Sequence, residues 1–346
     1  MLILNRKSIP KTKINSLLID GEALLKQGFH GTKDIQMKNG SVGAISHFIN
    51  TIKRFYQDQS ITKVIVFWEG ENSRVYRQRY YPYYKQNRND RYSEDQIYDL
   101  GRQRMRIKQY LEELFIRQVE IPGCEADDGI AYYVKNSPNE KKLIYTNDSD
   151  LLQLLADDVK VYLYGKKVVV NKDNFQNYFK YHYTNVGLLK MIAGDTADNI
   201  SGIQNIGEET VLKLFPALKK ETKTYEWILE ETDRLLLEKP TSNQLQTIKE
   251  GVTKWGTYGV DYFSVMNKII NLDQPNVTDE MKIIISEMVN EPLCPEGRGG
   301  VKQVIEMMKQ DEIINFIPKS DDAYFIFWST FITIIKKETN LYNKTR

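Results

Sequence analysis

The chain has 346 residues, of which 41% are hydrophobic, and this is enough apolar material to bury the core of one large domain or two. Its two cysteines cannot form a disulfide framework, and its N-terminus lacks the residue order of a signal peptide, which excludes a disulfide-rich secreted scaffold. The formal net charge is only +2. We therefore expect a globular protein in a reducing cytoplasm.

Three short apolar runs each end in acidic residues. "INSLLID" (14–20) ends at Asp20, "KVIVFWEG" (63–70) contains Glu69, and "KKLIYTNDSD" (141–150) ends with Asp148 and Asp150. A helical pattern follows each run, in "GEALLKQG", in the basic segment after residue 74 and in "SDLLQLLADD", so we predict an α/β fold with a central, mostly parallel sheet flanked by helices. In such sheets ligands bind beyond the carboxyl ends of the strands, where each run has placed its acids.

The segment from Arg74 to Lys108 holds ten basic residues against four acidic ones, together with seven tyrosines. Cations neutralise phosphates and aromatic rings stack on unpaired bases, so this composition favours a single-stranded nucleic acid as ligand. A solvated, salt-bridged helix face would explain the arginines but not the tyrosines. We therefore assign Arg77 and Tyr84 as candidate DNA-binding residues.

Two further acidic groups follow in chain order. "GCEADDGIAYY" (123–133) places Glu125, Asp127 and Asp128 at the start of a helical pattern, where acids often stabilise the N-terminal end of the helix dipole. Glu125 and Asp128 share one helix face, with Asp127 beside them. "AGDTADNISG" (193–202) adds a second pair, which consists of Asp195 and Asp198.

Nine carboxylates are thus candidates for one site. Left uncompensated they would repel one another by roughly 4 kcal/mol for each pair about 4 Å apart. An all-oxygen group selects hard divalent cations such as Mg²⁺ or Mn²⁺, and three histidines with two cysteines are too few and too scattered for zinc. Two such ions can activate a water and stabilise the leaving oxygen of a phosphodiester. The candidate metal ligands are Asp20, Glu69, Glu125, Asp127, Asp128, Asp148, Asp150, Asp195 and Asp198.

Five ordered stretches between residues 14 and about 215 resemble the flap endonuclease, or 5′-3′ exonuclease, family, which occurs as separate bacteriophage proteins and as a domain of bacterial DNA polymerase I. The length, with a helical C-terminal third, is most similar to the phage ribonuclease H type. The matching stretches are "IDGEALLKQGFHG", "VFWEGENSRVYRQRYYPYYKQNR", "GCEADDGIAYY", "YTNDSDLLQLL" and "IAGDTADNISGIQNIGEETVLKLF".

The resemblance implies a role for each acid. Asp20, Glu125, Asp127 and the acid after the second strand would hold the Mg²⁺ ion nearer the attacking water, with Mn²⁺ able to substitute. The second ion would be held by Asp148, Asp150 and Asp198, with Asp195 and Asp128 nearby. The family usually has Asp after the second strand, whereas this chain has "FWEGE", so Glu69 is our first choice and Glu71 the alternative.

The resemblance also implies how DNA is held. Lys85 and Arg88 would be catalytic residues that contact the scissile phosphate at the base of a helical arch (74–110). "GIQNIGEETVLKLF" resembles a helix–two-turn–helix motif (201–218), whose backbone amides approach a duplex phosphate, often with a K⁺ ion. An ordinary helix-turn-helix packed in the core is the alternative. The candidate DNA-binding residues of the helix–two-turn–helix motif are Gly202, Ile203, Asn205, Gly207 and Thr210.

The implied organisation is a nuclease core (14–200) followed by a helical subdomain (201–346). The implied activity is hydrolysis of phosphodiesters in DNA and RNA–DNA at 5′ flaps or RNA primers during replication. The implied partners are that DNA and the single-stranded-DNA-binding protein or sliding clamp of the replisome. We expect a monomer in the cytoplasm, which would be the host cytoplasm if a phage encodes the protein. A ribonuclease acting on folded RNA and a non-catalytic protein binding branched DNA are the alternatives.

Four remaining segments receive shorter predictions. Residues 1–13 are basic and predicted to be a mobile tail. Residues 224–239 read as an amphipathic helix, and the longest apolar run, 323–335, is too short to cross a bilayer and should be buried. "PEGRGG" (295–300) is expected to be a loop, with phosphate binding as the alternative.

Overall fold

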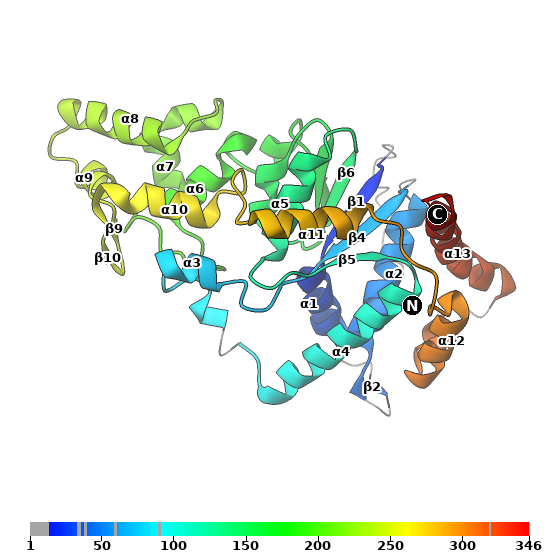
Figure 1. Ribbon diagram of the computed structural model, residues 1–346. Helices are drawn as coiled ribbons and strands as arrows, with labels where there is room; N and C mark the ends of the chain where they lie inside the picture. The colour runs from blue at the N-terminus through cyan, green and yellow to red at the C-terminus, as the bar shows by residue number, and fades with distance from the viewer. Residues whose placement is uncertain are drawn as a thin grey trace.

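The computed structural model describes residues 14–32, 36–37, 40–58, 61–88, 91–317 and 320–345. The basic tail predicted over residues 1–13 lies outside these ranges. In Figure 1, helices α7, α8 and α9 (Glu208–Leu214, Tyr225–Glu238 and Asn243–Lys249) lie at one end of the molecule. Helices α12 and α13 (Gly300–Gln310 and Asp321–Thr345) lie at the other end, with the central sheet between them.

The central sheet has six strands in the order β5-β4-β1-β6-β7-β8. All neighbouring pairs are parallel except β7 and β8, which are antiparallel. The prediction of a mostly parallel sheet flanked by helices is therefore confirmed. The strands are β1 Ser16–Asp20, β4 Lys63–Phe67, β5 Arg117–Val119, β6 Lys142–Thr146, β7 Val159–Leu163 and β8 Val168–Val170.

Helices cover both faces of this sheet, which explains why its central strands are continuous apolar runs. On one face Leu18, Ile65 and Ile144 join a cluster that includes residues of α5, α6, α10 and α11. On the other face Leu17 and Val66 join a cluster built with α1, α2, α4, α12 and α13. The helices are α1 Gly21–Gly31, α2 Gly43–Asp58, α4 Glu94–Glu113, α5 Ala126–Asn136, α6 Val186–Ala193, α10 Tyr262–Ile270 and α11 Asp279–Asn290.

Local sequence signals set several helix boundaries. The Asp20 carboxylate accepts the Ala23 amide and so begins α1, and Ser93 with Gln96 forms a capping box that begins α4. The segment "SDLLQLLADD" forms a 3₁₀ helix over Ser149–Leu154, not the longer helix that its pattern predicted. Asp148 caps this element by accepting the Asp150 amide at 2.8 Å. The chain leaves helical geometry at Leu155.

The shorter elements connect the sheet to the peripheral helices. α3 (Val75–Tyr80) and the turn η1 (Gln86–Arg88) carry the first part of the basic segment, whose second part lies in α4, and the hairpin β9–β10 (Val252–Thr253 and Gly256–Thr257) lies near α9. A small antiparallel pair is formed by β2 and β3 (Gln36–Met37 and Gly40–Ser41). The other 3₁₀ turns are η3 Phe175–Asn177, η4 Tyr183–Asn185, η5 Pro216–Lys219, η6 Gly259–Asp261 and η7 Ile313–Phe316.

The C-terminal part is helical, as predicted, but its helices divide between the two faces of the sheet. α10 and α11 contribute to one hydrophobic cluster and α12 and α13 to the other, so both clusters draw on residues before and after position 200. The division into residues 14–200 and 201–346 stays a prediction. The apolar run 323–335 lies in α13, where Phe327, Trp328 and Phe331 are buried.

Two further sequence expectations are settled by the fold. Among the described residues, no helix is both long and apolar enough to cross a bilayer. The amides of Gly299 and Gly300 in "PEGRGG" donate to one oxygen of Glu113 at 2.7 and 3.0 Å, so in this structure the loop binds an internal carboxylate.

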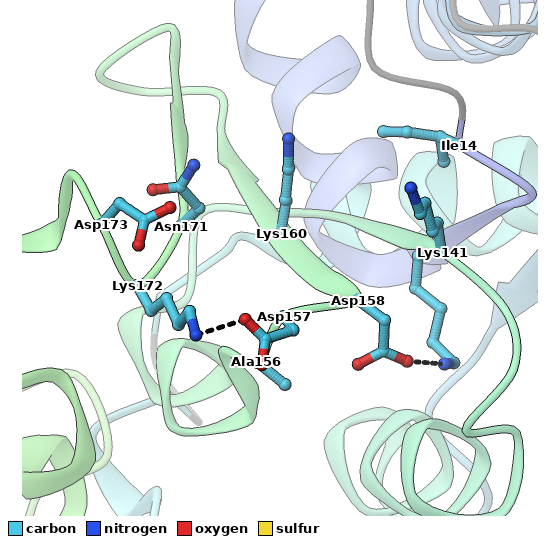
Figure 2. A pocket seen from close by; sticks show the side chains of 10 residues that line it. Ile14, Lys141, Ala156, Asp157, Asp158, Lys160, Asn171, Lys172 and Asp173 are labelled. Carbon is cyan, nitrogen blue, oxygen red and sulfur yellow. Dashed lines mark hydrogen bonds and ion pairs between the residues drawn. The ribbon is translucent and has the colours of Figure 1, made fainter.

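A cavity of about 220 Å³ lies at the edge of the sheet where β6 and β7 begin (Figure 2). Its lining includes charged side chains that are paired with each other: Lys142 contacts Asp158 at 2.7 Å, and Lys172 pairs with Asp157. The nine candidate acids are not among its lining residues. The site is therefore at the opposite, carboxyl edge.

Candidate active site

The carboxyl ends of β1, β4 and β6 bring the predicted acids together. The parallel register places Asp20, the last residue of β1, beside Phe67 of β4, and Glu69 follows two residues later. On the other side, the Thr146 hydroxyl at the end of β6 donates to Asp20 at 3.0 Å. Asp20, Glu69, Glu125 and Asp127 are called the first acid group below. Asp148, Asp150, Asp195 and Asp198 are called the second acid group.

Three of the four carboxylates of the first acid group are costly to ionise in this fold. Burial, followed by the charges of Asp148 and Asp20, raises the pKa of Asp127 well above its usual range. Burial also raises the pKa of Asp20. The pKa of Glu69 is raised to about 7 by burial, which Lys85 opposes and Glu125 reinforces. Burial and the mutual repulsion of these acids both disfavour their ionised forms. A divalent cation bound among them would offset both effects.

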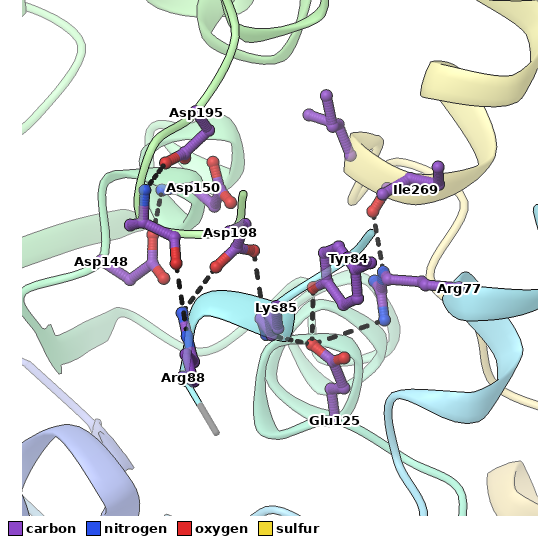
Figure 3. A network of polar contacts seen from close by, with 12 residues as sticks. Arg77, Tyr84, Lys85, Arg88, Glu125, Asp148, Asp150, Asp195, Asp198 and Ile269 are labelled. Atoms are coloured by element: carbon purple, nitrogen blue, oxygen red, sulfur yellow. Dashed lines mark hydrogen bonds and ion pairs between the residues drawn. The ribbon is translucent and has the colours of Figure 1, made fainter. Parts of the chain in front are cut away.

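Glu125 is the member of the first group that the protein's own cations neutralise (Figure 3). One of its carboxylate oxygens, Oε2, accepts Lys85 Nζ at 2.6 Å and the Tyr84 hydroxyl at 3.0 Å. Burial would raise the pKa of Glu125, but Lys85 and Arg77 lower it to about 2. Its other oxygen, Oε1, is buried and accepts no hydrogen bond from the described residues.

The second acid group surrounds a lysine that the sequence reasoning missed. Lys190 Nζ contacts Asp195 at 2.6 Å, pairs with Asp150, and lies 3.9 Å from Asp148. The nearest sequence signal is that Lys190 is the lone charge in the buried stretch "GLLKMI" of α6, five residues before Asp195.

Lys85 and Arg88 connect the two acid groups. Arg88 Nη2 contacts Asp198 at 2.5 Å, and Lys85 Nζ lies 3.8 Å from the same carboxylate while bonded to Glu125. Both residues belong to the turn that begins after Tyr84, and the Lys85 amide donates to the Asp198 carbonyl at 2.9 Å. The structure thus places both predicted catalytic cations at the junction of the acid groups.

Asp128 and Arg77 are partners of each other in the structure. They form a buried bidentate ion pair at 2.7 and 2.9 Å, and Asp128 also accepts the Asn276 amide. Glu125 has an extended backbone at the N-cap of α5, so it does not share the helix face of Asp128. The contacts give both residues a structural role, and their predicted roles as metal ligand and DNA contact stay predictions.

The tyrosines of the basic segment are mostly engaged within the protein. Tyr84, predicted to bind DNA, is 3% exposed and donates to Glu125, so its ring is not available for stacking on a base. Tyr83 stacks on Trp255 of the β9–β10 hairpin with ring centroids 4.2 Å apart and planes 9° apart. Tyr98, in contrast, is 75% exposed on α4.

The motif at residues 202–215 separates into a buried and an exposed part. Gly202 has φ +66° and packs so closely that a Cβ would lie 2.3 Å from the Gly194 nitrogen, so its role is in packing. Ile203 is 2% exposed and its amide donates to the Ile192 carbonyl, so in this structure it is a core residue, and its DNA contact stays a prediction. Asn205 and Gly207 are exposed before α7, and Thr210 is half-buried within it.

The choice between Glu69 and Glu71 has a geometric answer. Glu69 faces the site, where it accepts the Ser73 hydroxyl at 3.0 Å and is close enough to Lys85 and Glu125 to feel their charge. Glu71 is exposed, and its backbone carbonyl accepts the Gly123 amide. The geometry favours Glu69, and its role as a ligand stays a prediction.

Comparison with known proteins agrees with this arrangement. A family described as the 5′-3′ exonuclease, N-terminal resolvase-like domain, matches residues 15–180. A 5′-3′ exonuclease of Bacillus subtilis is 32% identical over 233 residues, which cover 62% of this chain and 72% of the relative. One of Halalkalibacterium halodurans is 30% identical over 214 residues, covering 57% and 68%. The chain belongs to the 5′-3′ exonuclease family.

This exonuclease-family chain is also similar to part of a bacterial DNA polymerase and to a bacteriophage exonuclease structure. DNA polymerase I of Thermus aquaticus is 29% identical over 239 residues, which cover 65% of this chain but 26% of the polymerase. A structure of the 5′-exonuclease of bacteriophage T5 with bound divalent metal ions (zinc) has the same fold, with a TM-score of 0.60 at 20% identity. It covers 87% of this chain and 99% of the phage protein.

The donor atoms of this exonuclease-family site suit divalent cations, but the structure does not hold them in a preformed metal-binding arrangement. Among the described residues, no three His, Cys, Asp or Glu side chains already form a metal-binding arrangement, because Lys85, Arg88 and Lys190 lie between the acids. The donors are nevertheless all carboxylate oxygens, as hard cations require. The free Oε1 of Glu125 and the raised pKa of Asp127 are the features that such a cation would satisfy.

Proposed function

We propose that this protein is a metal-dependent phosphodiesterase that acts as a 5′-3′ exonuclease and flap endonuclease and removes RNA primers or 5′ flaps in DNA replication. One observation carries the proposal: two groups of carboxylates meet at the carboxyl edge of the sheet, and Lys85 and Arg88 lie at their junction. A protein that only binds DNA would have no use for so many closely spaced carboxylates, because their repulsion destabilises the fold.

Each side chain has a distinct part in this proposal. Asp20, Glu69, Glu125 and Asp127 would hold one cation, and the second acid group would hold the other. When bound, the two Mg²⁺ ions supply an activated water and stabilise the leaving oxygen. Lys85 and Arg88 orient the scissile phosphate and neutralise charge that develops on it. Mn²⁺ is expected to substitute for Mg²⁺.

Duplex DNA is proposed to bind at the motif that contains Asn205 and Gly207. Both residues are exposed at the start of α7, and Asn205 has φ +60°, so this turn presents its backbone outward. A K⁺ ion at this turn remains a proposal based on resemblance. A bacteriophage T5 flap endonuclease whose structure has the same fold was determined as a complex with DNA and metal ions.

A cleavage assay on matched substrates tests the proposal. A 5′-flap DNA, an RNA-primed DNA and a folded RNA of equal length are incubated with wild type and Asp148→Asn, with Mg²⁺ or with chelator. We expect wild type to cut the first two with Mg²⁺ alone, and Asp148→Asn to cut neither. Cleavage restricted to folded RNA would support a ribonuclease, and tight binding without cleavage would support a non-catalytic protein.

We further propose that the protein is a monomer in the cytoplasm and that it contacts a single-stranded-DNA-binding protein or a sliding clamp.

A further inference from the structure

The two acid groups differ in how the protein itself neutralises them. Lys190 reaches from α6 into the second group, where its ammonium contacts Asp195 at 2.6 Å, pairs with Asp150 and lies 3.9 Å from Asp148. Only 15% of the Lys190 side chain is exposed. One ammonium therefore engages three of the four carboxylates of this group.

The corresponding cation of the first acid group is Lys85, and among the described contacts its ammonium pairs with one carboxylate of this group, that of Glu125. Lys85 bonds to one oxygen of Glu125 and leaves Oε1 of that residue without a hydrogen-bond partner. Asp20 accepts the Ala23 amide and the Thr146 hydroxyl, which are neutral donors. A cation approaching Asp20 therefore displaces no ammonium, whereas one approaching Asp150 must displace that of Lys190.

We propose that Lys190 is a built-in counter-cation that occupies the position of the second divalent cation and makes that site the weaker of the two. This inference rests on the proposed function. A divalent ion can enter the second acid group only by displacing the ammonium from Asp150 and Asp195, and it is repelled by the lysine charge while both are near. The two ions therefore bind in order, the first acid group filling before the second.

The surroundings of Lys190 allow this displacement. A groove of about 460 Å³ lies beside the second acid group and is lined by Lys190, Asp195, Ser149 and Lys254, among others. The flexible four-carbon stem of a lysine can move its ammonium into such a space without moving the helix. An arginine would keep the charge but has a larger, planar head that bonds carboxylates in a fixed geometry.

Manganese binding to the DNA-free protein tests the inference. Mn²⁺ titration followed by electron paramagnetic resonance and by calorimetry counts the ions and their affinities. We expect wild type to show a tight and a weak class that differ at least tenfold. Lys190→Gln should tighten the weak class at least tenfold and change the tight class less than threefold. Lys190→Arg should leave the weak class as weak as in wild type or weaker.

Two further measurements keep the result interpretable. The matched control is Lys180→Gln, since Lys180 pairs with Glu209 and both side chains are exposed at 72% and 76%; it should bind Mn²⁺ as wild type does. In chelator, Lys190→Gln should melt below wild type, because three carboxylates lose their counter-charge, and Mn²⁺ should raise its melting temperature more than that of wild type.

The inference is overturned by unchanged or weaker second-site binding in folded Lys190→Gln. If that variant does not fold, a tenfold tighter second site in Lys190→Arg overturns it equally. The cleavage assay on wild type is independent of both. Loss of all cleavage in wild type would refute the proposed function, whereas normal cleavage with unaltered Mn²⁺ classes in the Lys190 variants would refute this inference alone.

Discussion

Replacing Glu69 by Gln should stabilise the metal-free protein. Burial, opposed by Lys85 and reinforced by Glu125, raises the pKa of Glu69 from 4.5 to about 7. A carboxyl whose pKa is higher in the fold than in the unfolded chain makes the fold less stable as the pH rises through the folded value, because the unfolded chain ionises more readily. The cost is absent below pH 4.5 and fully developed above pH 7.

The size of this effect follows from the difference between the two pKa values. Each pKa unit corresponds to about 1.4 kcal/mol, so ionised Glu69 costs the fold about 3 kcal/mol near pH 8. Partial access of water to the side chain reduces this to about 2 kcal/mol. For a chain of this length, about 2 kcal/mol corresponds to a rise of about 3 °C in Tm.

Thermal melts in chelator and in Mg²⁺ provide the assay. In chelator at pH 8 we expect Glu69→Gln to melt about 3 °C above wild type, with most of the difference gone by pH 5. Mg²⁺ should raise the Tm of wild type more than that of the variant, because Gln is a poorer ligand. Glu71→Gln is the matched control and should behave as wild type. A Glu69→Gln variant that melts lower in chelator, or a Glu71→Gln variant that loses the response to Mg²⁺, would refute the reasoning.

Three further predictions concern other residues. Arg77→Met should lower the free energy of unfolding by about 3–5 kcal/mol in urea titrations because it leaves buried Asp128 unpaired. Wild-type stability together with weaker DNA binding would instead support Arg77 as a DNA contact. Lys85→Ala should slow single-turnover cleavage by about 10²–10³-fold, with duplex affinity nearly unchanged; equal losses in both would remove the catalytic role. Asn205→Asp should weaken duplex binding in fluorescence anisotropy, because it adds a negative charge beside a phosphate, but leave cleavage of bound substrate unchanged; unaltered affinity would exclude this turn from the duplex interface.

The central fold could be predicted because buried parallel strands are continuous apolar runs. β1, β4 and β6 have this pattern, and each is followed by its acids. β5 could not be found in the same way, because Arg117–Val119 is a short strand with two polar residues out of three. Arg117 is buried there by partners from distant parts of the chain, Glu338 and the carbonyl of Glu291. Local sequence carries no sign of those contacts.

In the site, too, local patterns could be predicted from the sequence, whereas contacts between distant residues could not. The gathering of acids followed from strand ends and spacing, which are local properties. The pairing of Arg77 with Asp128 joins residues 51 positions apart, and local sequence gives no sign of it, although a buried arginine needs a carboxylate partner. Lys190 was missed for a related reason: a single lysine in an apolar helix is ordinarily read as a side chain that extends to solvent.

The stack between Tyr83 and Trp255 joins the turn that holds Lys85 to the β9–β10 hairpin, which contacts the proposed duplex-binding motif. The hairpin is itself joined to that motif, since the Gln204 amide donates to the Val252 carbonyl at 2.8 Å. Any movement of the backbone of this turn must therefore carry Trp255 with it or separate two rings, at a cost of about 0.5–1.5 kcal/mol. Tryptophan emission should consequently report the position of this turn, and a Trp255→Phe variant would identify that signal among the four tryptophans.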